Sequence, residues 1–365
     1  GNFVNQEAFG PLIKYPGMIS DTATLNDAAL IAQREFLSKL LIPNFIIDRM
    51  YIPYSSASGW TVAGYYHPTF LYESVFNVIG VLLYTNLRKY IKKLHDLTGR
   101  NVICYYSGFL SNPNHPDTSI NDTDISGFMT AIHKLDKSKG LDLILHTPGG
   151  EVSATEAIGN YLREVFKGDI RVIIPQLAMS GGTMLSCISK EIVMGKHSSI
   201  GPIDPQFNGI PCYGVIEEFE QAKTEITQKP QTIPLWQMII NKYHPTFIGS
   251  CYKAIELSNN LVEKWLKEGE MFMDDSDKDK KIKNIIAYLN NNSDTKIHSR
   301  HISDEKAKEL GLKIYNLEED DAFQDAVLSI HHCYMHTFSN SSAVKIIENH
   351  KGIATVSIAQ NIQKN

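Results

Sequence analysis

One serine in this sequence lies where its hydroxyl could act as a nucleophile. Ser180 is part of AMSGGT (residues 178–183), which follows the apolar, strand-like run Arg171–Gln176 and leads into a helical pattern. Gly181 and Gly182 carry no Cβ, so another chain can come close to the serine hydroxyl. A serine held at such a turn, with backbone N–H groups nearby, suits a nucleophile beside an oxyanion site.

A second glycine turn upstream supplies a partner for this serine. The buried-strand pattern LDLILHTPGG (Leu141–Gly150) ends in Gly149 and Gly150, and apolar residues at helical spacing follow it. We expect the Gly149 and Gly150 amides to face an acyl oxygen while Ser180 attacks the carbon. A lone Ser-Gly-Gly turn is common for packing alone, so the prediction depends on the pairing of the two turns.

The elements that must position these turns alternate along the chain as strand, turn, helix, strand, turn, helix and strand. This alternation predicts right-handed βαβ crossovers and a parallel sheet. Both turns then lie at the carboxyl ends of strands, on one edge of the sheet, which is where open α/β sheets place their sites. The sequence therefore predicts an α/β fold.

Three blocks, TPGG, AMSGGT and HSSIGPIDPQ, resemble the Clp-fold serine peptidases, which include the Clp protease proteolytic subunit, signal peptide peptidase A and the crotonases. The serine dehydrogenase proteinase family resembles this chain in all three blocks, from about Tyr84 to the C-terminus. The resemblance implies a ClpP/crotonase-like parallel sheet with βαβ units and a helical C-terminal part. It also implies Ser180 as nucleophile and Gly149, Gly150 and Gly181 as oxyanion hole. We expect no cofactor and no metal.

The general base is where the chain departs from the Clp proteolytic subunit. The region that matches its histidine reads Ile200-Gly201-Pro202-Ile203-Asp204 here. A serine needs a base within hydrogen-bond reach, and two solutions are open.

Histidine titrates near neutrality, and His298 and His301 precede ISDEKAKELGL, which resembles a helix and turn that return the chain to the site in Clp-fold peptidases. Signal peptide peptidase A instead uses a lysine that burial keeps neutral. Lys253 in the apolar stretch CYKAIEL is best placed for that role. We rank His298 first and Lys253 second.

Residues 1–83 differ from the rest of the chain. GNFVNQE at the start and HPTFLYE (residues 67–73) resemble the prolipoprotein diacylglyceryl transferase family, an integral membrane enzyme. The apolar run after Glu73 has about half the length that a spanning helix needs. We therefore expect a transferase-like fragment without activity at 1–83, joined to a peptidase domain at 84–365.

Composition limits the partners and the compartment. The 365 residues carry a net charge of −5, which gives no electrostatic reason to expect nucleic acid as a partner. The five cysteines are scattered without metal-ligand spacing, which favours free thiols in a reducing compartment. With no signal-peptide pattern at the start, we expect a cytoplasmic location, and membrane association is not expected.

The leading interpretation is a serine peptidase that acts on a peptide or protein substrate. A crotonase-like acyl-CoA enzyme would use the same oxyanion hole without a nucleophile, and a catalytically inactive scaffold of the same fold is the non-enzymatic alternative. By resemblance to Clp-fold peptidases, which form rings or stacked trimers, we expect a homo-oligomer, assembled through the long helical segment Phe247–Glu270.

Overall fold

The computed structural model describes residues 27–39, 47–48, 50–52, 64–65, 87–207, 209–290 and 298–359. The chain divides into two compact units, Gly1–Leu83 and Tyr84–Asn365. The motifs GNFVNQE and HPTFLYE, and the apolar run that follows them, lie outside the described residues. In the first unit, α1 (Asp27–Lys39) is described together with the short antiparallel pair β1 (Tyr51–Ile52) and β2 (Gly64–Tyr65).

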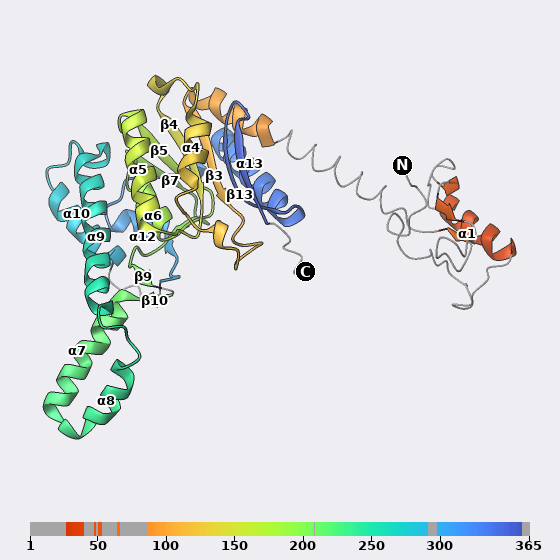
Figure 1. Cartoon of the computed structure of the whole chain (residues 1–365). Coiled ribbons are helices and arrows are strands. Elements are labelled where there is room, and N and C mark those ends of the chain that lie inside the picture. The colour runs from red at the N-terminus through yellow and green to blue at the C-terminus, as the bar shows by residue number, and fades with distance from the viewer. Residues whose placement is uncertain are drawn as a thin grey trace. The chain divides into compact units, whose positions relative to one another are not determined.

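The second unit is built on a seven-stranded sheet in the order β12-β7-β5-β4-β3-β13-β14 (Figure 1). Five of these strands pair in parallel, and β13 and β14 pair antiparallel at one edge. The strands are β3 (Asn101–Ser107), β4 (Leu141–His146), β5 (Ile170–Ile174), β7 (Glu191–Met194), β12 (Ile314–Asn316), β13 (Ala343–Asn349) and β14 (Ala354–Ile358). The parallel strands confirm the predicted α/β fold with βαβ units.

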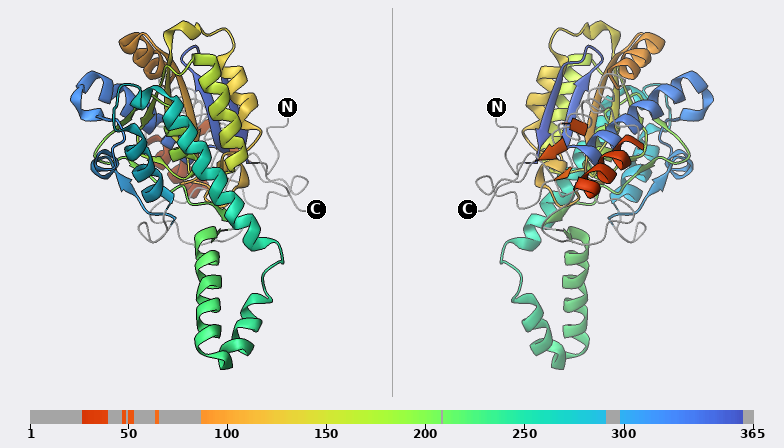
Figure 2. Two further views of the ribbon diagram at one scale, coloured as in Figure 1. Left: turned by 90° about the vertical axis from the view of Figure 1, so that its left-hand side faces the viewer. Right: turned by 90° about the vertical axis from the view of Figure 1, so that its right-hand side faces the viewer.

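Helices cover both faces of this sheet (Figures 1 and 2). Ile103 and Leu143 belong to a core shared with α4, α5, α6, α9 and α10. Their neighbours Val102 and Ile144 point to the opposite face, where they pack on residues 87–98 and α13, as the two-residue period of a strand requires. The helices are α4 (Asp124–Ile132), α5 (Val152–Phe166), α6 (Gly181–Ser186), α7 (Cys212–Gln228), α8 (Ile233–Ile240), α9 (Phe247–Glu268), α10 (Lys278–Asn290), α12 (Asp304–Glu309) and α13 (Asp321–Asn340).

Shorter strands complete the unit beside the ends of the main sheet. They are β6 (Leu177–Ala178), β8 (Ser199–Ile200), β9 (Gln206–Phe207), β10 (Ile210–Pro211) and β11 (Ile302–Ser303). β6 pairs with β8 in parallel and β11 pairs with β8 antiparallel, while β9 and β10 form a hairpin. These pairings bring segments around residues 178, 200 and 302 into one small sheet.

A helical arm projects from these layers. α7 and α8 extend away from the sheet as a hairpin, and α9 leads back to it, as both figures show. Cys212, Val215 and Cys251 form a small buried cluster at the base of the arm. Within the described residues, no helix combines the length and the apolar character that crossing a bilayer requires.

The part of the chain after α13 contains a feature that the sequence did not reveal. β13 and β14 form a hairpin at Asn349–Ala354, and β13 inserts between β3 and β14. Lys345 and Glu348 interrupt the apolar pattern of β13, although both are buried, at 2% and 0% exposed. A buried charged residue reads as a surface residue in a sequence, so this strand escaped recognition.

Candidate active site

The two glycine turns meet at the carboxyl end of β4. Thr147 forms a parallel bridge with Ala178, and the Met179 amide donates to the Thr147 carbonyl at 3.0 Å. The Thr147 amide in turn donates to the Leu177 carbonyl at 3.0 Å. The strand that ends in Pro148-Gly149-Gly150 is therefore hydrogen-bonded to the strand that ends in Ser180.

Ser180 has a backbone conformation that is rare for a residue with a side chain. Its φ is 49° and its ψ is −114°, and it precedes α6 without capping that helix through its hydroxyl. Such strain persists only where the surrounding structure imposes it, and it concentrates at functional sites. A serine on a sharp, strained turn between strand and helix presents its Oγ to solvent, in the manner of a nucleophile elbow.

The backbone amides of the two turns differ in whether a hydrogen bond already uses them. The Gly149 amide donates to Thr147 Oγ1 at 3.1 Å, so it is already used. The Gly150 and Gly181 amides donate to no acceptor in the described part of the chain. These two amides are close, because a Cβ built on Gly181 would lie 3.4 Å from the Gly150 nitrogen.

The close approach of the turns also explains why Gly149 has no side chain. Its φ is 95°, which side-chain-bearing residues rarely adopt. A Cβ at this position would lie 2.6 Å from Ser180 Cβ and 2.8 Å from the Gly181 nitrogen. Any larger residue here would push the serine turn away from the Gly149–Gly150 turn.

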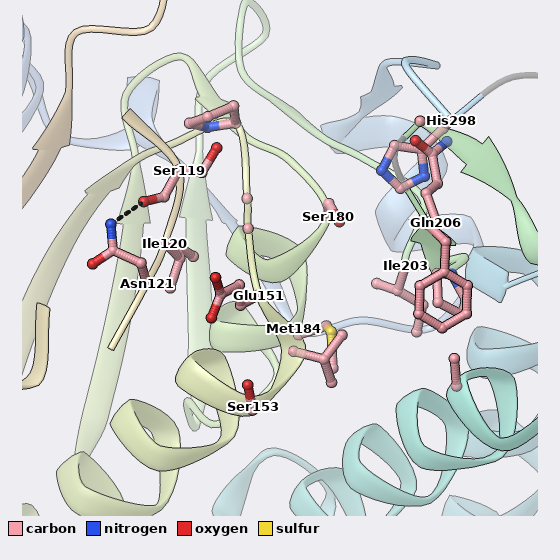
Figure 3. Close-up of a pocket in the computed structure, with 18 of the residues that line it drawn as sticks. Ser119, Ile120, Asn121, Glu151, Ser153, Ser180, Met184, Ile203, Gln206 and His298 are labelled. Atoms are coloured by element: carbon pink, nitrogen blue, oxygen red, sulfur yellow. Dashed lines mark hydrogen bonds between the residues drawn. The ribbon is translucent and has the colours of Figure 1, made fainter. Parts of the chain in front are cut away.

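These groups open onto one pocket of about 1020 Å³. Gly149, Gly150, Ser180, Lys253 and His298 all line it, so the structure brings together the predicted nucleophile, both predicted bases and two of the three predicted oxyanion glycines. Figure 3 shows Ser180 on one side of this pocket and His298 on the other.

His298 is held by a buried carboxylate. Its Nδ1 lies 2.8 Å from Asp204 Oδ1. Asp204 is 1% exposed, and its other oxygen, Oδ2, has no hydrogen-bond partner in the described regions. The carboxylate is therefore directed at the imidazole, as the third member of a nucleophile–base–orienter arrangement would be.

Asp204 itself was missing from our sequence prediction. It is the single acidic residue in HSSIGPIDPQ, in an apolar run shortly after the serine turn. The segment is fixed from both sides, since the Ile203 amide donates to the Leu289 carbonyl at 2.8 Å and Thr183 Oγ1 donates to the Gly201 carbonyl at 2.8 Å. A lone acid in an apolar run near a nucleophile is a signal that could have identified it.

Lys253 and His301 have different surroundings from His298. Lys253 lies on α9 and lines the pocket, but it is exposed, so it lacks the burial on which the lysine-base hypothesis depends. His301 is exposed and is not among the residues that line the pocket. Over the described ranges, no cluster of three or more His, Cys, Asp or Glu side chains is arranged to hold a metal ion.

Two known protein families match this chain, over ranges of different length. The ClpP-like SDH-type serine proteinase family matches residues 83–348, and the prolipoprotein diacylglyceryl transferase family matches residues 1–111. Both resemblances that the sequence motifs indicated are thus confirmed.

Individual relatives cover this chain to different extents. Two uncharacterized proteins of Methanocaldococcus jannaschii are each 32% identical, over 191 and 206 residues, which are 52% and 56% of this chain. The chain spans 59% and 62% of their lengths. A phosphatidylglycerol–prolipoprotein diacylglyceryl transferase of Staphylococcus aureus is 41% identical over 92 residues, which are 25% of this chain and 23% of that enzyme.

Proposed function

Because this chain belongs to the ClpP-like SDH-type serine proteinase family, we propose that it hydrolyses peptide bonds through an acyl-enzyme on Ser180. One observation carries the proposal. The strained Ser180 lies beside two unused amides, those of Gly150 and Gly181, in the same pocket as an imidazole held by a buried carboxylate. Nucleophile, oxyanion donors and base are the three parts that acyl transfer needs.

The proposed reaction begins with attack by Ser180 Oγ on the carbonyl carbon of a peptide. The Ser180 proton passes to His298, and the negative charge on the carbonyl oxygen is stabilised by the Gly150 and Gly181 N–H groups. His298 then gives the proton to the leaving amine, and the C–N bond breaks. A water molecule, deprotonated by His298, hydrolyses the ester and restores Ser180.

His298 is the proposed base because of its hydrogen bond to Asp204. With its proton on Nδ1, the imidazole donates to Asp204 Oδ1 and keeps the Nε2 lone pair for the serine proton. As the imidazolium forms, the buried carboxylate stabilises its charge. Lys253 is exposed and so lacks the burial that a lysine base requires.

Covalent labelling tests the nucleophile. A fluorophosphonate probe should label the wild-type chain at Ser180, and Ser180→Ala should abolish labelling while the fold is retained. Ser153 lines the same pocket and provides a matched control, because Ser153→Ala removes a hydroxyl without touching the strained turn. Equal labelling of the Ser180→Ala variant would exclude Ser180 as the nucleophile.

The same experiment separates the alternatives. A crotonase-like acyl-CoA enzyme would keep the oxyanion donors but would give no covalent adduct on Ser180. A catalytically inactive scaffold would give no adduct and would turn over neither peptides nor thioesters. Labelling at Ser180 together with peptide cleavage distinguishes the peptidase from both.

We also propose a homo-oligomer that assembles through α9. Tyr252 and Leu257 on this helix are 51% and 44% exposed, and contact with a second copy of the chain would bury Tyr252. Light scattering at micromolar concentration should give a mass above that of one chain, and a monomer would contradict the proposal.

The N-terminal unit has no proposed transferase activity. Its similarity to the diacylglyceryl transferase covers under a quarter of that enzyme's length. We propose that residues 1–83 are a fragment of such a protein, carried by a peptidase domain at 84–365. A diacylglyceryl transfer assay with the full chain should show no product above background.

A further inference from the structure

A short strap of backbone runs along the glycine turn that supplies the oxyanion donor. The strap consists of residues Thr118–Asn121, and Ser119, Ile120 and Asn121 line the pocket (Figure 3). The Ile120 amide donates to the Gly149 carbonyl at 2.8 Å, and the Ile120 carbonyl accepts from the Glu151 amide at 2.9 Å. Because this parallel pairing uses the groups on either side of Gly150, the Gly150 N–H points away from the strap.

Ile120 packs closely against both glycines that carry the unused donors. A Cβ built on Gly150 would lie 2.3 Å from the Ile120 nitrogen and oxygen, so only glycine allows the strap to pass. A Cβ on Gly181 would lie 3.3 Å from Ile120 Cδ1. The position of the strap therefore determines where the Gly150 amide points and how closely the Gly181 turn can approach it.

A buried ion pair holds the strap in place. Lys345 Nζ donates to the Ser119 carbonyl at 2.7 Å and to Asp124 Oδ1 at 2.8 Å. Asp124 Oδ2 accepts from the Asn121 amide at 3.1 Å and from the Tyr105 hydroxyl at 2.8 Å. The two charged residues are 2% and 3% exposed. Both ends of the Ser119–Asn121 segment are thus bonded to a single pair of side chains.

Stability alone does not account for this arrangement. Burying a lysine and an aspartate costs desolvation free energy that their attraction often does no more than offset, and apolar residues of similar size frequently stabilise a fold as well. Lys345 belongs to β13 and Asp124 is the first residue of α4. Among the described residues, the backbone groups that bond to their side chains all belong to the strap. Its specific effect is on the position of the strap.

We propose that Lys345 and Asp124 are positioning residues, which hold the strap so that the Gly150 and Gly181 amides converge on the oxyanion. This inference rests on the peptidase activity proposed above. Neither residue lines the pocket, so they act through Ile120 and touch no substrate. Because oxyanion donors act on the transition state, displacing them lowers kcat and leaves KM unchanged.

The test replaces the pair by neutral side chains of similar size, in the double variant Lys345→Met/Asp124→Asn. We expect kcat for a peptide substrate to fall about 10- to 100-fold with KM within about twofold, because a displacement of about 1 Å has effects of this size. Amide hydrogen exchange at Ile120 and Glu151 should become at least about tenfold faster, since both amides belong to the strap pairing.

Asp142→Asn provides the matched control. Asp142 is fully buried and accepts from Arg100 at 2.7 Å and from Arg171 at 2.6 Å, near the start of β4, whereas Gly149 and Gly150 follow the other end of that strand. Removal of its charge should lower the melting temperature. It should leave kcat and the exchange of Ile120 and Glu151 unchanged.

Each outcome decides the proposal. A folded double variant with wild-type kcat and unchanged exchange at Ile120 and Glu151 would overturn it, as would an equal loss of kcat in Asp142→Asn. If the double variant does not fold, Tyr105→Phe provides a milder test, because it removes one hydrogen bond to Asp124. This variant should still accelerate amide exchange at Ile120. Unchanged exchange would refute the proposal that the Lys345–Asp124 pair holds the strap. If the wild-type chain neither reacts with the fluorophosphonate probe nor cleaves peptides, the proposed function fails. The exchange measurement then decides by itself whether the Lys345–Asp124 pair holds the strap.

Discussion

The two halves of the candidate site are built in different ways. Ser180 and the glycine amides come from consecutive strand–turn–helix units, and backbone pairing of Thr147 with Ala178 joins them. Asp204 and His298 are 94 positions apart, separated by the helical arm, and a single side-chain hydrogen bond joins them. The nucleophile half is therefore set by local backbone geometry, whereas the base half depends on how the arm returns to the sheet.

Removal of the imidazole should have the largest effect on the base half. His298→Ala should lower turnover at least about a hundredfold, the low end for loss of a general base. Lys253→Ala is the control in the same pocket, and it should have a much smaller effect. Peptidase assays and melting curves of both variants check this. An inactive Lys253→Ala variant that folds normally, beside an active His298→Ala variant, would make the lysine the base.

Asp204→Asn should weaken the base half without removing the base. The amide has the shape of the carboxylate but cannot stabilise an imidazolium, so we expect turnover to fall about a hundredfold or more. Steady-state kinetics with a peptide substrate measure the loss. A second measurement, fluorophosphonate labelling, should slow by a similar factor. Unchanged rates in both assays would show that His298 acts without its carboxylate.

A single methyl group should test how tightly the nucleophile half is built. Gly149→Ala places a Cβ 2.6 Å from Ser180 Cβ, so turnover should fall about tenfold or more as the serine turn moves. Gly168→Ala is a matched control, because Gly168 also has a positive φ, 83°, but its Cβ would meet nothing closer than 3.6 Å. Both variants should lose about 1–3 kcal/mol of stability to backbone strain, and only the first should lose activity.

The core behind the nucleophile half should make stability depend on pH. Burial, and then the neighbouring His331, lower the pKa of His146 to about 3. Burial, with His332 and His197, lowers the pKa of His331 to about 4. In the unfolded chain both imidazoles become protonated near pH 6.5, whereas in the folded chain they stay neutral down to pH 3–4. The two histidines therefore do not affect the free energy of unfolding above pH 6.5, and they lower it as the pH falls from 6.5 toward 3–4.

The free energy of unfolding should fall by about 1.4 kcal/mol per pH unit for each histidine. Melting temperatures between pH 7 and pH 5 measure it. The melting temperature of a His146→Leu variant should fall less steeply over this range than that of the wild type, whatever the stability of the variant at pH 7. Parallel curves for the two proteins would show that His146 is not the group responsible.

The sequence predicted the parts of this molecule that depend on local pattern. Two buried strands, each followed by glycines and a helical period, suffice to infer the βαβ units and the meeting of Gly150 with Ser180. Residues 87–98 form a helix whose burial follows the helical period, since Leu87, Ile91 and Leu94 are buried and Lys89 and Lys92 are exposed.

The parts that escaped prediction depend on polar residues whose partners lie far away in the chain. Asp204 reads as a turn residue before a proline until His298 is placed beside it. Lys345 reads as a surface residue until Asp124 and the Ser119 carbonyl surround it. No pattern of spacing encodes such pairs, because their free energy comes from mutual desolvation in the folded chain.

The insertion of β13 beside β3 joins strands that a ribosome makes far apart in time. A ribosome makes Ser180, Asp204 and His298 before it makes Lys345, so the proposed catalytic side chains precede the lysine that holds the strap. Domains fold as their sequences emerge, and β3 cannot acquire its antiparallel neighbour until β13 leaves the exit tunnel. If the chain is the peptidase proposed above, its oxyanion site can reach its final geometry only after β13 has been made.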